Sequence, residues 1–132
     1  MAVILDSDIC VEIIRENQYY TSVFNENFDV GLKVTFMTAS ELLYGSYLSS
    51  RGEAQINATN AFLHFFDVIV PDINSCHQFG QMKAALQKNG NLIPDADLII
   101  ASLAIANDLP LVSNNQKHFE RLTAFGLRLE SW

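Results

Sequence analysis

The chain has 132 residues, enough for one compact domain with a buried core. Its composition, 49% hydrophobic and 17% charged, is typical of globular proteins and excludes a disordered chain. With 15 acidic and 8 basic residues the formal charge is −7 and no basic tract is present, so any nucleic acid must be attracted by local positive groups or bound cations.

The N-terminal part of the chain predicts a strand followed by two helices. Residues 2–5 are a continuous apolar run rich in branched side chains, which suits a strand buried on both faces. Ser7 can cap the helix that follows, which puts Asp6 at a strand-to-helix junction. Apolar residues near helical spacing predict a second helix over residues 18–28, and Gly31 marks its end.

The middle of the chain predicts two further strands with helices between them. Residues 32–37 (LKVTFM) form a second strand, and Thr38 with Glu41 fits the capping-box pattern of a short helix before SSRG. Another helix is expected from Glu53 to Phe65, and FDVIVP is a third strand that Pro71 closes.

The C-terminal part predicts two long helices and two strands. Asp72 and Asn74 can cap a helix that runs to about Lys88, and Asp95 can cap the apolar helix after Pro94. LPLVSN is a fourth strand, HFERL a helical turn and GLRLESW a last short strand. Because strands alternate with helices, we predict an α/β fold: a single domain over residues 1–132, with a mostly parallel central sheet of four to five strands flanked by helices.

Neither cysteine spacing nor apolar runs indicate export or membrane insertion. Cys10 and Cys76 share no metal-binding spacing, which favours a reducing compartment. Met1 leads into a short apolar run without a basic region, and the longest apolar stretch, LIIASLAIA, is far too short to cross a bilayer. We therefore expect a cytoplasmic protein with no membrane partner.

Four polar side chains occur where strands end or the next helices begin: Asp6, Glu41, Asp97 and Asn115. The carboxyl ends of parallel strands meet at one edge of a sheet, where open α/β folds bind ligands. Three carboxylates gathered there would repel one another unless a hard cation intervened. A bound Mg²⁺ or Mn²⁺ also lowers the pKa of a coordinated water, so the pattern predicts metal-dependent phosphate chemistry.

Each of these side chains also has a structural interpretation. An acid such as Asp6 favours the dipole of the helix it precedes, and Glu41 can bond back to a Thr cap. Asn115 can form an Asx turn after its strand. Of the two acids in the first turn of the apolar helix, Asp95 is the better cap and Asp97 the better candidate for a ligand.

The order and spacing of five motifs resemble those of the PIN-domain ribonucleases, most closely the VapC-type toxins of bacterial toxin–antitoxin pairs. The motifs cover nearly the whole chain: LDSDICVEIIR, TASELLYG, IPDADLIIASLAI, LVSNNQKHFERL and GLRLESW. The resemblance implies a PIN-like fold and hydrolysis of RNA phosphodiester bonds. It also implies a homodimer and a cognate antitoxin whose tail lies across the toxin and can block the metal site.

Carried over motif by motif, the resemblance assigns the site residues. Asp6, Glu41 and Asp97 would hold Mg²⁺ or Mn²⁺, and Asn115 takes a fourth place that holds Asp or Asn in the family. Ser113 stands where Thr is usual. Ser113 and Asn115 would orient a water or the phosphate by hydrogen bonds, since neither is a natural general base.

Other residues near these motifs are interpreted as structural. The three histidines show no metal-ligand spacing, and His118 is expected to be a surface or packing residue. Lys117 and Arg121 could meet substrate phosphates, but a solvated helix face is favoured.

Two other classes of function stay open. Asp6-Ser7-Asp8 is a D-x-D after the first strand, which also resembles haloacid-dehalogenase-type phosphatases with a nucleophilic Asp. The Lys and the paired Asp of that family are not clearly placed here, and Lys117 is poorly positioned for a response-regulator receiver. A non-catalytic PIN-like binding module is compatible with Asn115.

Overall fold

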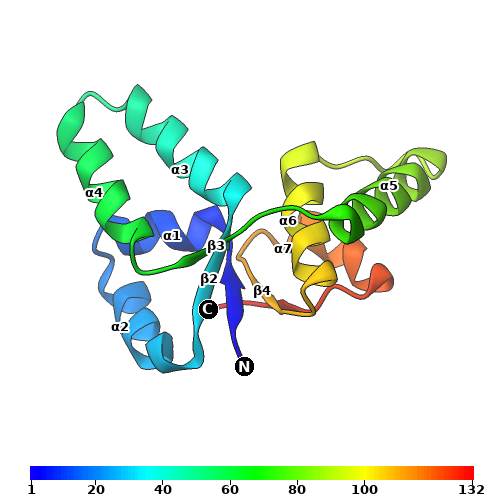
Figure 1. Cartoon of the computed structure of the whole chain (residues 1–132), viewed down its shortest axis with the longest axis horizontal. Coiled ribbons are helices and arrows are strands. Elements are labelled where there is room, and N and C mark those ends of the chain that lie inside the picture. The colour runs from blue at the N-terminus through cyan, green and yellow to red at the C-terminus, as the bar shows by residue number, and fades with distance from the viewer.

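A sheet of five parallel strands lies at the centre of the computed structural model, which describes residues 1–132 (Figure 1). The strands are β1 (Val3–Leu5), β2 (Leu32–Thr35), β3 (Asp67–Ile69), β4 (Leu111–Val112) and β5 (Leu129–Glu130). Their order across the sheet is β3-β2-β1-β4-β5, and every neighbouring pair is parallel. The prediction of an α/β fold with a parallel sheet flanked by helices is therefore confirmed.

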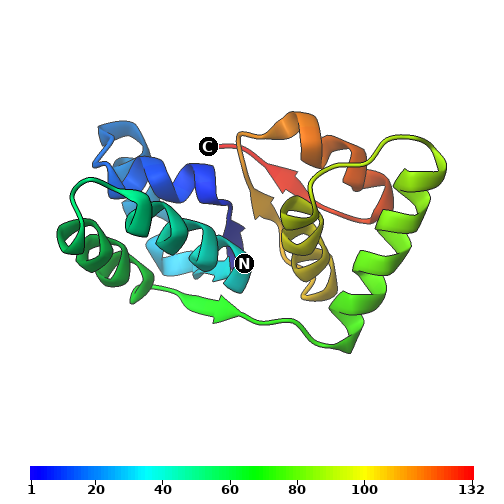
Figure 2. The same ribbon diagram turned by 90° about the horizontal axis from the view of Figure 1, so that it is seen from above.

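Helices make every connection between the strands. They are α1 (Ser7–Ile14), α2 (Gln18–Asn27), the 3-10 helix η1 (Phe28–Val30), α3 (Phe36–Leu48), α4 (Glu53–Leu63), α5 (Ile73–Lys88), α6 (Asp95–Ala106), α7 (Gln116–Phe119) and the 3-10 helix η2 (Glu120–Phe125). Helices α1 to α4 lie on one side of the sheet and α5 to α7 on the other (Figure 2). The sheet is thus covered on both faces, as βαβ connections require.

The central strands β1 and β4 supply both hydrophobic cores. Ile4 is paired in register with Leu111, and Leu5 with Val112. Ile4 and Leu111 belong to the buried cluster on the α5–α7 side, whereas Leu5 and Val112 belong to the cluster on the α1–α4 side. Because side chains alternate along a strand, a strand buried on both faces must be continuously apolar, as residues 2–5 are.

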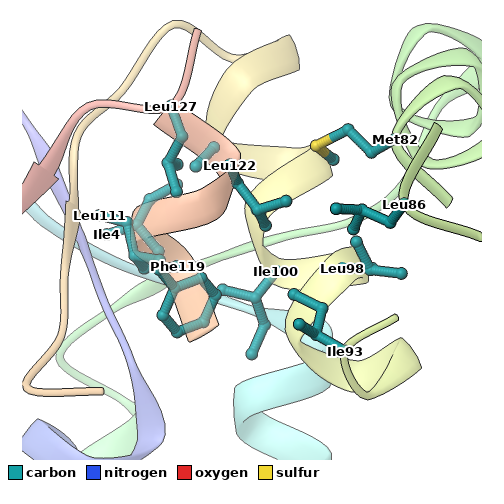
Figure 3. Close-up of a cluster of buried hydrophobic side chains, with 12 residues drawn as sticks. Ile4, Met82, Leu86, Ile93, Leu98, Ile100, Leu111, Phe119, Leu122 and Leu127 are labelled. Carbon is teal, nitrogen blue, oxygen red and sulfur yellow. The ribbon is translucent and has the colours of Figure 1, made fainter. Parts of the chain in front are cut away.

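Phe119 connects the short helix α7 to the core. Its side chain is fully buried in the cluster that also contains Ile100 of α6 and Leu111 of β4 (Figure 3). Burial of an aromatic side chain of this size is worth about 2 kcal/mol or more, enough to hold a four-residue helix that could not form alone. The residues before Phe119 are therefore held against α6.

The start of α3 differs from the prediction. The helix begins at Phe36 with Thr35 as its cap, whose Oγ1 accepts a hydrogen bond from the Thr38 amide at 3.1 Å. The prediction of Thr38 as the cap and of a strand as far as residue 37 was wrong, because the side chain of Thr35 satisfies the first turn earlier. Glu41 consequently lies beyond that turn and is not part of a capping box.

The N-terminal caps of α1, α5 and α6 were also predicted, and the cap of α5 is confirmed. Asp6, rather than Ser7, caps α1, since its Oδ1 accepts from the Ser7 amide at 2.8 Å. Asp72 caps α5 as expected, in a reciprocal pair with Ser75. Asp95 does not cap α6. It forms an ion pair with Lys83 at 3.0 Å instead.

Cys10 is buried and Cys76 is exposed, and both are free thiols. None of the helices combines the length and the apolar character that crossing a membrane requires.

Candidate active site at the carboxyl edge of the sheet

Asp6 lies directly after β1, and Ser113 lies directly after the adjacent strand β4. The Ser113 hydroxyl donates to Asp6 Oδ2 at 2.7 Å, and the Ser7 amide donates to Oδ1 at 2.8 Å. Asp6 is only 4% exposed. Burial, outweighing these hydrogen bonds, raises the pKa of Asp6 to about 6, and the charges of Asp8 and Asp97 add to the shift.

Glu41 reaches the same region from α3. Burial raises the pKa of its carboxyl group, and the charges of Asp6 and Asp97 raise it further. Its Oε1 atom is buried and has no hydrogen-bond partner. A buried carboxylate oxygen without a partner is costly, so Glu41 is poised to accept a donor or a cation.

Asp97, in the first turn of α6, is held from the opposite direction by α7. The Nδ1 atom of His118 lies 2.6 Å from Asp97 Oδ2 and 3.1 Å from the Asn115 side-chain amide. One ring nitrogen cannot both donate to Asp97 and accept from Asn115. The shorter contact, to Asp97, assigns the proton to Nδ1, so His118 donates to Asp97 and the Asn115 side chain is only in close contact with the ring.

The turn after β4 connects the surroundings of Asp6 with those of Asp97. Ser113 Oγ accepts from the Asn115 amide at 3.0 Å while donating to Asp6. Hydrogen bonds join Asp6, Ser113 and the Asn115 backbone, and the Asn115 side chain is in close contact with His118, which donates to Asp97. The structure brings together the side chains that the sequence singled out, with Glu41 close enough for its carboxyl group to be affected by the charges of Asp6 and Asp97.

His118 was missed as a member of this cluster. His118 was expected to be a surface or packing residue; it is about one-third exposed, and it also bonds directly to Asp97. A signal for it was present in the sequence: His118 follows Asn115 by three residues, which places both on one face of a helical turn. Helix α7 provides that turn.

Asp8 and Asn114 form a second bridge next to the cluster. The Asn114 amide donates to Asp8 Oδ2 at 2.9 Å, and the Asn114 side chain donates to the Tyr20 hydroxyl at 2.6 Å. Burial raises the pKa of Asp8. Because these bonds tie α1 and α2 to the turn after β4, they fix the backbone on which Ser113 and Asn115 are carried.

The remaining candidates lie outside the network. Asp95 is exposed and paired with Lys83. Lys117 is exposed, and Arg121 donates to the backbone oxygen of Asn91 at 3.3 Å, which agrees with a solvated helix face.

The donor set suits a hard divalent cation, because Asp6, Glu41 and Asp97 offer only oxygen atoms. The unpartnered Glu41 Oε1 and the mutual repulsion of the acids are the features such an ion would relieve. No three histidine, cysteine, aspartate or glutamate side chains lie close enough together to ligate one ion at once. Mg²⁺ is commonly bound by one or two carboxylates and keeps several waters, so the arrangement can still hold it.

Comparison with known proteins extends this description. The PIN domain model matches residues 3–124. "Ribonuclease VapC2" of Haemophilus influenzae is 36% identical over 129 residues, covering 97% of this chain and 96% of the relative. "tRNA(fMet)-specific endonuclease VapC" of Shigella flexneri is 30% identical over 131 residues, covering 97% and 96%.

A solved structure has nearly the same fold. A chain in the crystal structure of VapBC2 from Rickettsia felis, bound to a DNA fragment from their promoter, superimposes with a TM-score of 0.92. It is 29% identical, and the match covers 100% of this chain and 99% of that one. The chain therefore belongs to the PIN-domain family and, within it, to the VapC ribonucleases.

Proposed function

We propose that this chain is an endoribonuclease toxin that hydrolyses RNA phosphodiester bonds with the help of Mg²⁺ or Mn²⁺. The observation that carries the proposal is the gathering of Asp6, Glu41 and Asp97 at one edge of the sheet, in a chain of the VapC family. A cluster of desolvated carboxylates has little structural benefit, because each raises the energy of the others. It is suited to a cation that binds phosphate.

Each residue of the cluster has its own role in the proposed reaction. One or two of the carboxylates of Asp6, Glu41 and Asp97 would hold the cation, which would lower the pKa of a bound water and stabilise charge on the phosphate oxygens. Ser113 and the Ser7 amide each donate to one oxygen of Asp6 and so fix the orientation of its carboxylate. Asn115 carries a side-chain amide whose N–H groups can donate to a phosphate oxygen.

Cleavage of RNA by the purified protein tests the proposal. Because a relative at 30% identity is named a tRNA(fMet)-specific endonuclease, initiator transfer RNA is the first substrate to try, followed by total cellular RNA. We expect cleavage with millimolar Mg²⁺ or Mn²⁺, none with excess EDTA, and recovery when the ion is restored. Equal rates with and without EDTA would contradict a metal-dependent reaction.

We further propose that the protein acts in the cytoplasm as a homodimer and is inhibited by a cognate antitoxin. A structural neighbour at 29% identity is a VapBC complex, and an acidic surface of charge −7 suits a basic segment of a partner.

The alternatives receive less support. In the phosphatase reading Asp6 is a nucleophile, but both of its oxygens accept hydrogen bonds and the chain matches a different family. A non-catalytic binding module would bind the ion without cleaving RNA, which the EDTA experiment distinguishes.

His118 is expected to position Asp97 for the cation. Replacing His118 with Leu removes the donor at 2.6 Å and should weaken Mn²⁺ binding by about 10- to 100-fold, as loss of a hydrogen bond to a metal ligand commonly does. Titration calorimetry of the purified protein with Mn²⁺ measures this effect directly.

His118→Asn is the matched control, because its side-chain N–H can occupy nearly the position of Nδ1. We expect Mn²⁺ affinity within a few-fold of the wild-type value for this variant, with similar thermal stability for both variants, since buried Phe119 still anchors α7. Equal affinities for the Leu variant and the wild type would show that His118 has no such role.

A further inference from the structure

A groove opens beside Glu41 between helices α1, α3 and α4, with a volume of about 380 Å³. Ser7 and Glu41 line the part of the groove near the acid cluster. Arg15 and Arg51, which follow the last residues of α1 and α3, also line it. Both helices begin at the sheet edge and lead away from it (Figure 1). Eight residues separate Ser7 from Arg15, which corresponds to about 12 Å along a helix.

The two arginines of the groove are not neutralised by acids. Of the eight lysines and arginines in the chain, three form ion pairs with aspartates: Lys33, Lys83 and Arg128. Arg15 and Arg51 have no carboxylate oxygen within 4.0 Å. Arg51 instead donates to Gln55 Oε1 at 2.9 Å, which holds its guanidinium along the groove.

Most of the residues that line the groove are polar or charged. Only three of its 12 lining residues are hydrophobic. Ser46 donates to the Leu42 carbonyl at 2.8 Å, so the 2.6 Å contact between Ser46 and Thr59 has Thr59 as its donor. The hydroxyl, amide and guanidinium groups of this lining can bond to a strand that carries charge and hydroxyl groups.

We propose that this groove binds the RNA strand next to the cleaved bond, with Arg15 and Arg51 contacting its phosphates. The proposal rests on the ribonuclease function proposed above. A chain of charge −7 repels RNA on average, so a strand that reaches the acid cluster needs local cations beside it. Arginine suits this role because its planar guanidinium can contact two phosphate oxygens at once.

The salt dependence of RNA binding tests the subsite. Binding is measured with the Asp6→Asn variant, so that the probe is not cleaved. The probe is fluorescein-labelled bulk transfer RNA. Adding Arg15→Gln and Arg51→Gln together should weaken binding by about tenfold at low salt. It should also make the slope of log K against log salt shallower by about 0.7 to 0.9 for each lost phosphate contact.

Lys88→Gln is the control with the same loss of charge. Lys88 ends α5 on the other side of the sheet, far from the groove, and it also lacks an ion pair. This variant should keep the affinity and slope of its parent. With Asp6 restored, the double arginine variant should raise KM for RNA while kcat changes less than about twofold, since contacts away from the reacting atoms bind ground and transition states alike.

Two results would overturn the subsite. One is an unchanged slope and an unchanged KM in the double arginine variant while the wild type cleaves RNA. The other is a variant that binds RNA normally and loses only its antitoxin, which would assign the groove to the protein partner. Failure of the wild type to cleave any RNA would instead reject the proposed function, so the two failures are distinguishable.

Discussion

Replacing Asp6 with Asn is expected to reduce the rate of RNA cleavage by about a thousandfold or more. The substitution keeps the size and shape of the side chain but removes the negative charge that would hold the cation. The fold should survive, because the Ser113 hydroxyl can rotate to accept from the new amide while the Ser7 amide still meets an oxygen. A cleavage assay at saturating Mg²⁺, with growth of cells expressing the variant as a second readout, measures the effect.

Asp95→Asn is the matched control for this experiment. Asp95 is an exposed acid near the site that is paired with Lys83, so the same chemical change there should leave cleavage within about twofold of the wild type. If Asp6→Asn cleaved RNA within tenfold of the wild-type rate while remaining folded, Asp6 would not be part of the catalytic machinery.

The second large effect concerns stability and pH in the presence of EDTA. The pKa of Asp6 is raised from 3.8 to about 6 in the folded protein, so the folded state binds the proton more tightly than the unfolded state. The associated stability is fully present below about pH 3.8 and is lost as pH rises through about 6. A shift of this size corresponds to a loss of about 3 kcal/mol from this group.

Denaturant unfolding at a series of pH values measures this loss. The raised pKa values of Asp8 and Glu41 change stability in the same direction, so the contribution of Asp6 is the difference between the wild type and Asp6→Asn. We expect the Asn variant to have a flatter profile and to be more stable than the wild type above about pH 6. Parallel profiles for the two proteins would mean that burial of Asp6 does not oppose its ionisation.

Much of the fold was predictable because local signals and packing agree. Residues 2–5 are apolar at every position, which only a strand covered on both faces tolerates, and β1 is the central strand of the sheet. The start of α3 was placed wrongly because Thr35 and Thr38 are equally good caps by residue type. The choice between them depends on where β2 stops pairing with its neighbours, which is a property of the sheet.

The sequence by itself determined the alternation of strands and helices and the placing of Asp6 and Asp97 at the ends of those elements. Residue type, apolar periodicity and motif order are local or collinear properties, so they can be read without coordinates. Only the tertiary structure decided which side chains meet: Ser113 with Asp6 across 107 residues, and His118 with Asp97 across 21. Such contacts depend on the order of the strands and on the packing of Phe119, the last residue of α7, in the core. Strand order and packing fix the distances between segments that are far apart in the sequence, and the sequence pattern does not specify these distances.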